Sequence, residues 1–485
     1  MSEDESHDLM AVRRSKMLAL KNAGISPFGS AFGPVERSSQ LLAGFEEGRK
    51  ACFAGRILAH RKMGKSQFMH LADEDGSFQI YLRKDELSEA ALETFKQVDL
   101  GDFIGVQGTL FKTQTGEPTL HAREFTFLSK ALRPLPAKWH GLTDTEQRYR
   151  QRYLDLISND EVRRVLTLRC RMVAEIRAYL IERGFLEVET PMMQAVPGGA
   201  AANPFVTHHK ALDIDLYLRI APELYLKRLL VGGYTRIFEL NRNFRNEGLS
   251  RKHNPEFTML ELYQAFSDFE GMADLVEGLI VHLAEKFCGG TTLRHEKADG
   301  SVLEINLARP WKRRTYHDCI RDVAGADWFD LSADQRRDRA QNELQLEILP
   351  HLEDFEVTNQ VFEKCVEAKT MDPLFVTHLP KELVPLAKQN AENPDLVDVY
   401  ELIVNGQELS PGYSELNDPD EQRSRLEDQA GEEVQKLDDD FLLALEHGMP
   451  PAGGLGLGID RLVMLLTGAE SIRDVIYFPL MRPKV

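Results

Sequence analysis

Two short alternating segments that flank a charged loop constrain the fold of this chain more than any other feature. Residues 237–240 read Ile-Phe-Glu-Leu and residues 257–263 read Phe-Thr-Met-Leu-Glu-Leu-Tyr, so apolar and polar side chains alternate in both segments. Such alternation is typical of strands that bury one face. The sequence therefore predicts a hairpin of two strands, with the charged residues of the intervening loop gathered at one end.

The loop of this hairpin carries side chains suited to binding a nucleoside triphosphate. It begins with Phe-Arg-Asn-Glu-Gly at 244–248 and ends with Arg-Lys-His-Asn-Pro-Glu-Phe-Thr at 251–258. An arginine can grip a phosphate with two parallel hydrogen bonds. A glutamate can accept from an exocyclic amine, a histidine can contact a phosphate tail, and a phenylalanine can stack on a base. On residue types alone, a solvated hairpin of mixed charge explains the loop equally well.

A second informative segment is the glycine-rich run Gly-Gly-Leu-Gly-Leu-Gly-Ile-Asp-Arg-Leu at 453–462. Glycines let a strand approach a ligand closely. The apolar run 462–466 predicts a buried helix that starts near Asp460 and projects Arg461 from its first turn. The run is not a dinucleotide fingerprint, because position 459 is isoleucine. Close structural packing is the usual alternative explanation of such glycines.

A third segment predicts a helix followed by a strand. Residues 177–183 end a helical pattern at Gly184, a plausible glycine just past a helix end, and the strand pattern 185–191 closes on Pro191. Taken together, the three segments resemble motifs 1, 2 and 3 of the class II aminoacyl-tRNA synthetases.

Within class II, the chain is similar to the bacterial lysyl-tRNA synthetases along nearly its whole length. The matching strings lie in both halves of the chain: Gly64-Lys65 with Phe68, 130–136, 148–158, 197–202, 207–209, 219–229, 413–418, 445–450 and 472–483. The resemblance implies ATP-dependent activation of L-lysine and its transfer to the 3′ end of tRNA(Lys).

The first third of the chain predicts a small barrel. Five alternating segments, at 52–58, 68–71, 78–82, 103–110 and 119–128, are separated by turns and by one helical insert at 87–97. Five strands with a helix between the third and fourth is the order of an OB fold, a barrel that binds single-stranded nucleic acid.

The predicted fold is α+β: an N-terminal OB-fold β-barrel plus a class II synthetase antiparallel sheet flanked by helices. We expect a basic helix and lead-in at 1–50, which includes Arg13 and Lys16 as candidate tRNA contacts. The anticodon-binding OB domain follows at 51–130, a linker with Pro134 and Pro136 at 131–147, and the catalytic domain at 148–485. A charged helical stretch is expected at 422–445, and residues 324–331 are expected to be an inserted loop.

The resemblance also implies a lysine pocket, formed by Gly199, Glu223, Glu261, Tyr263, Tyr413 and Glu415. A buried ammonium needs carboxylates on converging strands. By resemblance, Glu261 and Glu415 neutralise the side-chain ammonium, while Glu223 and the backbone near Gly199 hold the α-amine. Tyr413 would cover the aliphatic stem. Each glutamate taken alone is equally explained as a surface charge.

The resemblance assigns the remaining pocket residues to ATP, Mg²⁺ and tRNA. Arg245 and Arg461 are the expected catalytic residues, and the expected ATP site comprises Arg245, Glu247, His253, Asn254, Phe257 and Arg461. Glu401 and Glu408 would carry Mg²⁺, which favours carboxylates together with phosphate oxygens. Phe68 and Gln79 would meet the anticodon, although Phe68 is equally explained as a barrel-core residue.

Two positions depart from the usual family pattern. Asn203 stands where members usually have arginine, and Pro411 stands where many have asparagine. Proline supplies neither an N–H group nor an amide side chain. Any hydrogen bond that the asparagine would make must therefore be lost or replaced, but the acidic pair is intact, so lysine remains the best-fitting substrate.

Composition sets the outer bounds of these predictions. The net charge of −18 argues against indiscriminate nucleic-acid binding but leaves room for a local tRNA-binding face. No apolar stretch is long enough for a membrane span, and the five cysteines lack paired spacing, which favours a reducing cytoplasm. A homodimer is implied by the resemblance alone.

Three rival functions share parts of this sequence pattern. A class II-like ligase that attaches a lysine-like amino acid to a protein generally lacks the OB domain, and the pattern at 52–128 argues against it. A catalytically inactive tRNA-binding paralogue is disfavoured by the intact Arg245, Glu247, Glu408 and Arg461. An aspartate or asparagine enzyme is disfavoured because an acidic pocket repels a substrate carboxylate.

Overall fold

The chain forms two units, Met1–Thr143 and Asp144–Val485. The structure is a computed structural model that describes residues 3–136, 142–200, 202–296, 299–430 and 438–483. Parts of the predicted linker (137–141), the residue Ala201 of the small-residue string, and residues 431–437 of the predicted charged helix lie outside this description. None of the described helices is long and apolar enough to cross a membrane.

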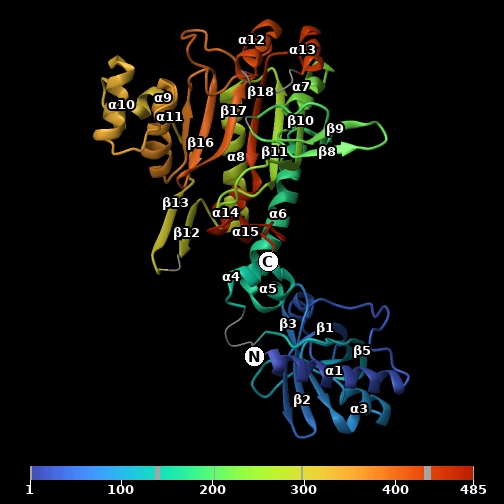
Figure 1. Ribbon diagram of the computed structural model, residues 1–485. Coiled ribbons are helices and arrows are strands. Elements are labelled where there is room, and N and C mark those ends of the chain that lie inside the picture. The colour runs from blue at the N-terminus through green and yellow to red at the C-terminus, as the bar shows by residue number, and fades with distance from the viewer. Residues whose placement is uncertain (1–2, 137–141, 201, 297–298, 431–437, 484–485) are drawn as a thin grey trace. The chain divides into compact units, whose positions relative to one another are not determined.

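The smaller unit is built on a closed five-stranded barrel in the order β1-β2-β3-β5-β4 (Figure 1). This confirms the OB-fold prediction, including a helix between the third and fourth strands. Its elements are α1 (Glu3–Asn22), α2 (Ser38–Ala43), β1 (Lys50–Met63), β2 (Ser66–Ala72), β3 (Ser77–Arg83), α3 (Glu89–Phe95), β4 (Phe103–Lys112) and β5 (Pro118–Ser129).

Strand alternation fixes which side chains fill the barrel. In β2, Met69 and Leu71 are fully buried, whereas Phe68 and His70, which alternate with them, lie on the other face. Helix α1 is the basic helix expected in the N-terminal lead-in. Two of its basic residues are engaged inside the unit: Arg13 donates to the carbonyls of Leu100, Ala131 and Arg133, and Lys16 pairs with Asp99 at 2.5 Å. These contacts tie α1 to the loops beside the barrel, and tRNA contact by Arg13 and Lys16 stays a prediction.

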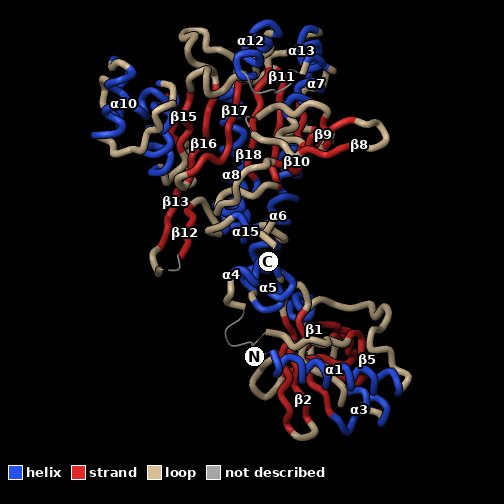
Figure 2. The backbone as a smooth tube through the Cα atoms, viewed as in Figure 1, coloured by secondary structure: helices blue, strands red, loops and turns tan. Residues whose placement is uncertain are grey.

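The larger unit contains an eight-stranded sheet in the order β14-β15-β16-β17-β18-β11-β10-β6. Its strands are β6 (Leu186–Glu187), β10 (Arg236–Phe244), β11 (Glu256–Ala265), β14 (Lys312–Thr315), β15 (Leu374–Thr377), β16 (Val399–Val404), β17 (Gln407–Ser414) and β18 (Ala452–Gly458). All neighbours pair antiparallel except at the two edges, where β14–β15 and β10–β6 are parallel. The prediction of an antiparallel sheet flanked by helices is thus confirmed (Figure 2).

Helices surround this sheet, and two small sheets project from it (Figure 1). The helices are α4 (Thr145–Arg150), α5 (Arg152–Ser158), α6 (Asp160–Glu182), α7 (Glu223–Val231), α8 (Phe269–Cys288), α9 (Tyr316–Ala324), α10 (Ala333–Asn342), α11 (Asp354–Val361), α12 (Pro419–Ala430), α13 (Asp439–Glu446), α14 (Ile459–Thr467) and α15 (Ile472–Val475). The small sheets join β7 (Met193–Gln194) to β9 (Ile214–Leu218) and β8 (Val206–His209), and β12 (Thr292–Glu296) to β13 (Val302–Asn306).

Several local predictions differ from the structure. The strand expected over 185–191 pairs only at Leu186–Glu187. The loop expected at 324–331 contains a short 3₁₀ helix, and Trp328 within it is fully buried in an apolar cluster with α9 and α11. Its indole N–H donates to Thr358 Oγ1 at 3.3 Å. A single tryptophan with distant partners leaves no periodic trace in the sequence, so pattern analysis missed this packing.

The main core lies between the sheet and helices α6, α8 and α14. Met172 and Ile176 of α6, Leu283 of α8 and Leu462 of α14 pack there against Phe238 of β10. One polar tie crosses this core. Asp460, at the start of α14, accepts hydrogen bonds from Arg169 Nη1 of α6 at 2.5 Å and from the backbone N–H of Thr258 in β11 at 2.8 Å.

The buried Arg169–Asp460 pair yields a stability prediction. Arg169→Met leaves the carboxylate of Asp460 without its counter-charge, so we expect the larger unit to lose about 3–5 kcal/mol of unfolding free energy in a denaturant titration. Arg164→Met is the matched control, because Arg164 pairs with Glu161 on the exposed face of the same helix. It should cost less than about 1 kcal/mol. Equal losses for both variants would contradict the role given to the buried pair.

Candidate active site

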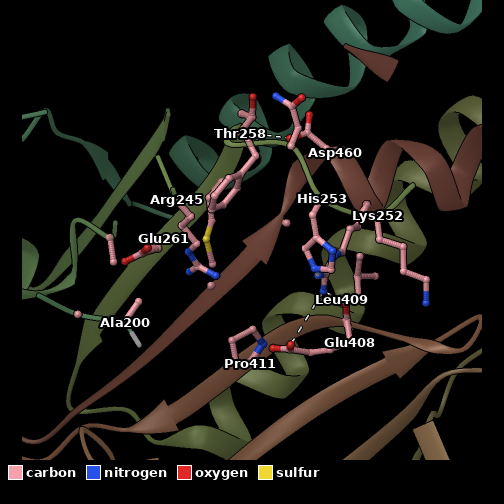
Figure 3. A pocket seen from close by; sticks show the side chains of 18 of the residues that line it. Ala200, Arg245, Lys252, His253, Thr258, Glu261, Glu408, Leu409, Pro411 and Asp460 are labelled. Atoms are coloured by element: carbon pink, nitrogen blue, oxygen red, sulfur yellow. Dashed lines mark hydrogen bonds and ion pairs between the residues drawn. The ribbon is translucent and has the colours of Figure 1, made fainter. Parts of the chain in front are cut away.

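One cavity of about 360 Å³ opens on the face of the large sheet between β11, β17, β18 and the start of α14 (Figure 3). This volume lies in the range of small-molecule sites. Its wall includes Gly199, Ala200, Ala221, Glu223, Arg245, Glu247, Gly248, Lys252, His253, Asn254, Pro255, Phe257, Thr258, Met259, Glu261, Tyr263, Glu408, Leu409, Pro411, Tyr413, Leu455, Gly456, Gly458, Asp460, Arg461 and Ile472.

The cavity brings together most of the residues that the sequence singled out. The lining contains Gly199, Glu223, Arg245, Glu247, His253, Asn254, Phe257, Glu261, Tyr263, Glu408, Tyr413 and Arg461. Glu415 and Glu401 are not part of the lining: Glu415 is 1% exposed directly behind it, and Glu401 lies on β16, opposite Pro411. Phe68 and Gln79 belong to the barrel unit. The roles given to these residues remain predictions.

The hairpin predicted from the alternating segments positions one wall of the cavity. Strands β10 and β11 pair in register, with Glu239 opposite Glu261 and Asn243 opposite Phe257. Directly opposed residues share a face, and the β11 residues of this face, Phe257, Glu261 and Tyr263, line the cavity. The alternation seen in the sequence is therefore what delivers these three side chains to the site.

Arg245 follows β10 and reaches the middle of the cavity. Its backbone N–H is anchored on the carbonyl of Pro255 at 2.8 Å, and its guanidinium carbon lies 5.1 Å from the ring centroid of Phe257. The buried Nε of Arg245 has no hydrogen-bond partner within the described chain. A buried donor without a partner is costly, so the side chain is poised to receive an acceptor from a ligand.

A cationic group forms one end of the cavity. Arg461 Nη1 donates to the carbonyl of Glu408 at 2.6 Å, and its Nη2 lies 3.3 Å from His253 Nε2. Burial and the nearby guanidinium of Arg461 lower the pKa of His253. The neutral form of His253 is therefore favoured, and its two ring nitrogens contact Ser250 Oγ at 2.9 Å and Arg461 Nη2 at 3.3 Å.

The opposite end is acidic and deeply buried. Glu223, Glu261 and Glu415 are each at most 6% exposed. Burial and the negative charge of Glu223 raise the pKa of Glu261 well above its usual range. Burial also raises the pKa of Glu415, to about 7, with Lys227 opposing and Glu223 adding to the shift. Three carboxylates concentrated in this way indicate a site for cationic groups of a ligand.

Glycines of β18 make room for this acidic end. A Cβ atom on Gly454 would lie 2.0 Å from Glu415 Oε1 and 2.6 Å from Tyr263 Cε1, which is far inside contact distance. A Cβ on Gly458, in the same run, would meet only the Arg461 side chain, at 3.7 Å or more. The first of these glycines is required by close packing against the site, whereas the second is not.

A second carboxylate cluster lies beside the cationic end. Burial, together with the charges of Glu408, Glu367 and Glu363, raises the pKa of Glu401 well above its usual range. Glu367 also accepts the backbone N–H of Glu408 at 3.2 Å. Carboxylates that repel one another in this way have the chemistry of a divalent-cation site. Within the described ranges, no group of three or more His, Cys, Asp or Glu side chains is arranged so that it could hold a metal ion.

The two departures from the family pattern differ in where they lie. Pro411 lines the cavity in β17, where the side-chain methyl of Met259 and the ring of Pro411 both face Gly456 of β18. Asn203 is exposed and outside the lining, and its carbonyl accepts the backbone N–H of Asn246 at 2.7 Å. Pro411 therefore adds apolar surface to the cavity, while Asn203 holds the charged loop by its backbone.

The barrel unit presents an aromatic surface. The ring of Phe68 lies 4.9 Å from that of Tyr81, which lies 5.7 Å from Phe111 and 5.0 Å from His121. Phe68 is only half-buried and belongs to the outer face of the barrel. Gln79 is buried and donates from Nε2 to Thr119 Oγ1 at 2.8 Å. Sequence analysis missed Tyr81, Phe111 and His121, although alternation places Tyr81 on the same face as Phe68.

Sequence comparisons agree with this geometry. The family model of class II tRNA synthetases (D, K and N) matches residues 144–482, and that of an OB-fold nucleic-acid-binding domain matches residues 51–128. The chain is 50% identical to a lysine–tRNA ligase of Pelotomaculum thermopropionicum, over 99% of this chain and 96% of that protein. It is also 50% identical to one from Carboxydothermus hydrogenoformans and 46% identical to one from Bacillus cereus, over 100% of this chain and at least 99% of those proteins.

The two glycines of β18 provide a direct test of the acidic end. Gly454→Ala should displace Glu415 and Tyr263 and lower the affinity for L-lysine, the ligand that the resemblance implies, at least about tenfold by calorimetry. Gly458→Ala is the matched control in the same strand and should bind L-lysine within about twofold of the wild type. Equal affinities of the two variants would contradict the packing argument.

Proposed function

The chain belongs to the class II tRNA synthetases of the D, K and N group, and we infer from its pocket that it is a lysine–tRNA ligase. In the first step, the carboxylate of L-lysine attacks the α-phosphate of ATP, which forms lysyl-adenylate and releases pyrophosphate. In the second step, a hydroxyl of the terminal adenosine of tRNA(Lys) attacks the adenylate carbonyl and AMP leaves. Neither step requires a covalent intermediate on the protein.

The acidic end of the cavity is the observation that carries the substrate assignment. Glu223 and Glu261 line the cavity and Glu415 lies directly behind it. L-lysine brings two ammonium groups, and buried ammonium groups require such partners. We assign the α-amine to Glu223 and the backbone near Gly199, and the side-chain ammonium to Glu261 and Glu415 with the hydroxyl of Tyr263. Tyr413 covers the aliphatic stem. A substrate carboxylate in this end would be repelled, which disfavours aspartate.

Arg245 is proposed to join the two substrates. Its Nε has no hydrogen-bond partner among the described residues, and its guanidinium charge acts both on Glu261 of the acidic end and on His253 of the cationic end. Its guanidinium can therefore hold the lysine carboxylate and the α-phosphate together. This accelerates the reaction by positioning the two groups and by neutralising their negative charge. This arrangement brings the attacking carboxylate oxygen next to the α-phosphorus. The step requires no proton transfer by the protein.

The cationic end is assigned to ATP. Phe257 and Arg461 face the cavity and are proposed to sandwich the adenine, while Glu247 accepts from its exocyclic amine. The buried Oδ1 of Asn254 has no hydrogen-bond partner in the described part of the chain, and its Nδ2 donates to the carbonyl of Glu256 at 2.6 Å. It therefore shapes the adenine slot. The neutral His253 contacts the terminal phosphates.

Glu401 and Glu408 are proposed to hold Mg²⁺. The mutual repulsion of the carboxylates around Glu401 fits a divalent cation, because such a charge would relieve it. When bound, Mg²⁺ would neutralise phosphate charge and polarise the phosphoryl oxygens. Glu367 accepts the backbone N–H of Glu408 and so helps to fix the position of the Glu408 carboxylate in the site.

The barrel unit is proposed to read the anticodon of tRNA(Lys). Phe68, half-buried on the outer face of the barrel, is proposed to stack on a base, and Gln79 lies on the neighbouring strand of the same face. We also propose a homodimer formed through the segment of α6 and β6, and a cytoplasmic location, where the substrates tRNA and ATP are found. All five cysteines are free thiols, as a reducing compartment requires.

Two rival functions give different outcomes in one assay. A ligase that attaches a lysine-like amino acid to a protein activates an amino acid but charges no tRNA. An inactive paralogue activates none. The barrel unit and the similarity along the whole chain favour tRNA charging over both.

The test is amino-acid-dependent ATP–pyrophosphate exchange with each standard amino acid, followed by charging of tRNA(Lys). Exchange should occur with lysine and be followed by charging. Arg245→Ala should lower kcat/KM for exchange by at least about a thousandfold, because it removes transition-state charge stabilisation. Arg242→Ala is a control on the same hairpin, where Arg242 lies outside the cavity lining. Normal exchange by Arg245→Ala would refute the mechanism.

The raised pKa of Glu415 predicts a pH dependence of lysine binding. The substrate ammonium needs the ionised carboxylate, which is present above pH 7 and is lost as the pH falls through about 7. KM for lysine in the exchange assay should therefore rise by about tenfold for each pH unit below 7, while KM for ATP changes little. A flat KM for lysine from pH 8 to pH 6 would contradict the involvement of Glu415.

A further inference from the structure

A lysine of the protein itself sits among the carboxylates proposed for the substrate. Lys227 of α7 is fully buried. Its Nζ lies 2.7 Å from Glu223 Oε1 and 2.6 Å from Glu415 Oε2. One internal ammonium is thus shared by a carboxylate of the helix and a carboxylate of the residue that follows β17, and both carboxylates are proposed to bind L-lysine.

Each of these two carboxylates keeps one oxygen away from Lys227. Both oxygens of Glu415 are buried without a hydrogen bond of good geometry among the described residues; Oε2 forms the ion pair with Lys227, whereas Oε1 lies next to Gly454. Glu223 Oε2 lies beside Gly199, 3.7 Å from the position of a Cβ there, and Gly199 lines the cavity. Lys227 therefore fixes one oxygen of each carboxylate and leaves the other for a cation that is not part of the protein.

The charges of the pocket balance only when Lys227 is counted. When all three are ionised, as binding of the substrate ammonium groups requires, Glu223, Glu261 and Glu415 carry three negative charges, and Lys227 reduces their sum to two. L-lysine supplies two ammonium groups for these, and its carboxylate is matched by Arg245. Buried charges are tolerated only when they are paired in this way.

We propose that Lys227 is a positioning residue of the lysine pocket: a resident counter-cation that aims the free oxygens of Glu223 and Glu415 at the substrate ammonium groups and makes the site complementary to a doubly cationic ligand. The proposal rests on the lysine–tRNA ligase function inferred above and deepens it. Lys227 does not contact the reacting atoms and acts through the two glutamates.

The charged and titratable groups around Glu415 determine how its ionisation should change when the Lys227 ammonium is removed. They are Lys227 and Glu223 from α7, Tyr263 from β11, and Tyr413 from β17. Lys227 is the only cation of this set, and it holds the pKa of Glu415 down against burial. Its removal raises that pKa further, so the free variant carries a proton on Glu415 that must leave when the substrate ammonium binds.

The experiment compares Lys227→Met with the wild type in the intact enzyme. At pH 8.0, KM for lysine in pyrophosphate exchange should rise at least tenfold while KM for ATP stays within twofold. Calorimetry in two buffers of different ionisation enthalpy should show release of close to one proton per L-lysine bound by the variant and almost none by the wild type. A purely structural role of Lys227 would not change the proton count.

Lys130→Met is the matched control. Lys130 is also a fully buried lysine shared by two carboxylates, those of Asp99 at 2.6 Å and Asp102 at 2.8 Å, but it belongs to the barrel unit. It should lower stability and leave KM for lysine and the proton count unchanged. A Lys227→Met enzyme that binds L-lysine within twofold of the wild type without proton release overturns the proposal.

A second variant decides the case if Lys227→Met does not fold. Lys227→Arg keeps the charge but has a longer, planar head group. It should raise KM for lysine at least threefold with an unaltered pH profile, because the carboxylates are displaced yet remain ionised. An unchanged KM overturns the proposal. Absence of lysine-dependent exchange by the wild type would instead refute the proposed function itself.

Discussion

The carboxylate of Asp460 is the contact on which the geometry of the catalytic unit depends. It accepts hydrogen bonds from the Arg169 side chain of α6 and from the backbone N–H of Thr258 in β11. Asp460 itself lies in the first turn of α14, directly before Arg461. Arg169 in turn donates to Thr258 Oγ1 at 2.9 Å. A buried ion pair with good hydrogen bonds contributes more to geometric specificity than to stability. Here it ties together the three sequence motifs that otherwise lie on separate elements.

A gradient of charge runs across the cavity that this contact holds in place. One end offers Arg461, Arg245 and a neutral His253, and the other concentrates three carboxylates around an internal ammonium. The anionic phosphates and the cationic ends of L-lysine are thereby sorted to opposite ends, so that the lysine carboxylate and the α-phosphate meet at Arg245. Because the protein charges are fixed before the substrates bind, little reorganisation is needed during the reaction.

Local patterns predicted some elements well and others poorly. The alternation in 237–240 and 257–263 predicted β10 and β11, and the barrel strands were found from the same signal. Trp328 and Lys227 were missed for the same reason. Trp328 lies in a segment without periodicity. Lys227 follows an apolar run in a helix, and a lysine at such a position is usually solvated on the helix surface. Their burial comes from α11 in the first case and from Glu415 in the second, both far away in the sequence.

The sequence by itself determined the family, the OB barrel and the residue types of the site. Motifs and strand alternation are local features, so they can be recognised without knowing which residues are in contact. Only the tertiary structure decided which side chains share a pocket. It placed Glu415 behind the lining, put Gly454 against it, and enclosed Lys227 between two carboxylates. Burial and charge pairing depend on distant segments meeting, and these two quantities control the ionisation on which lysine binding depends.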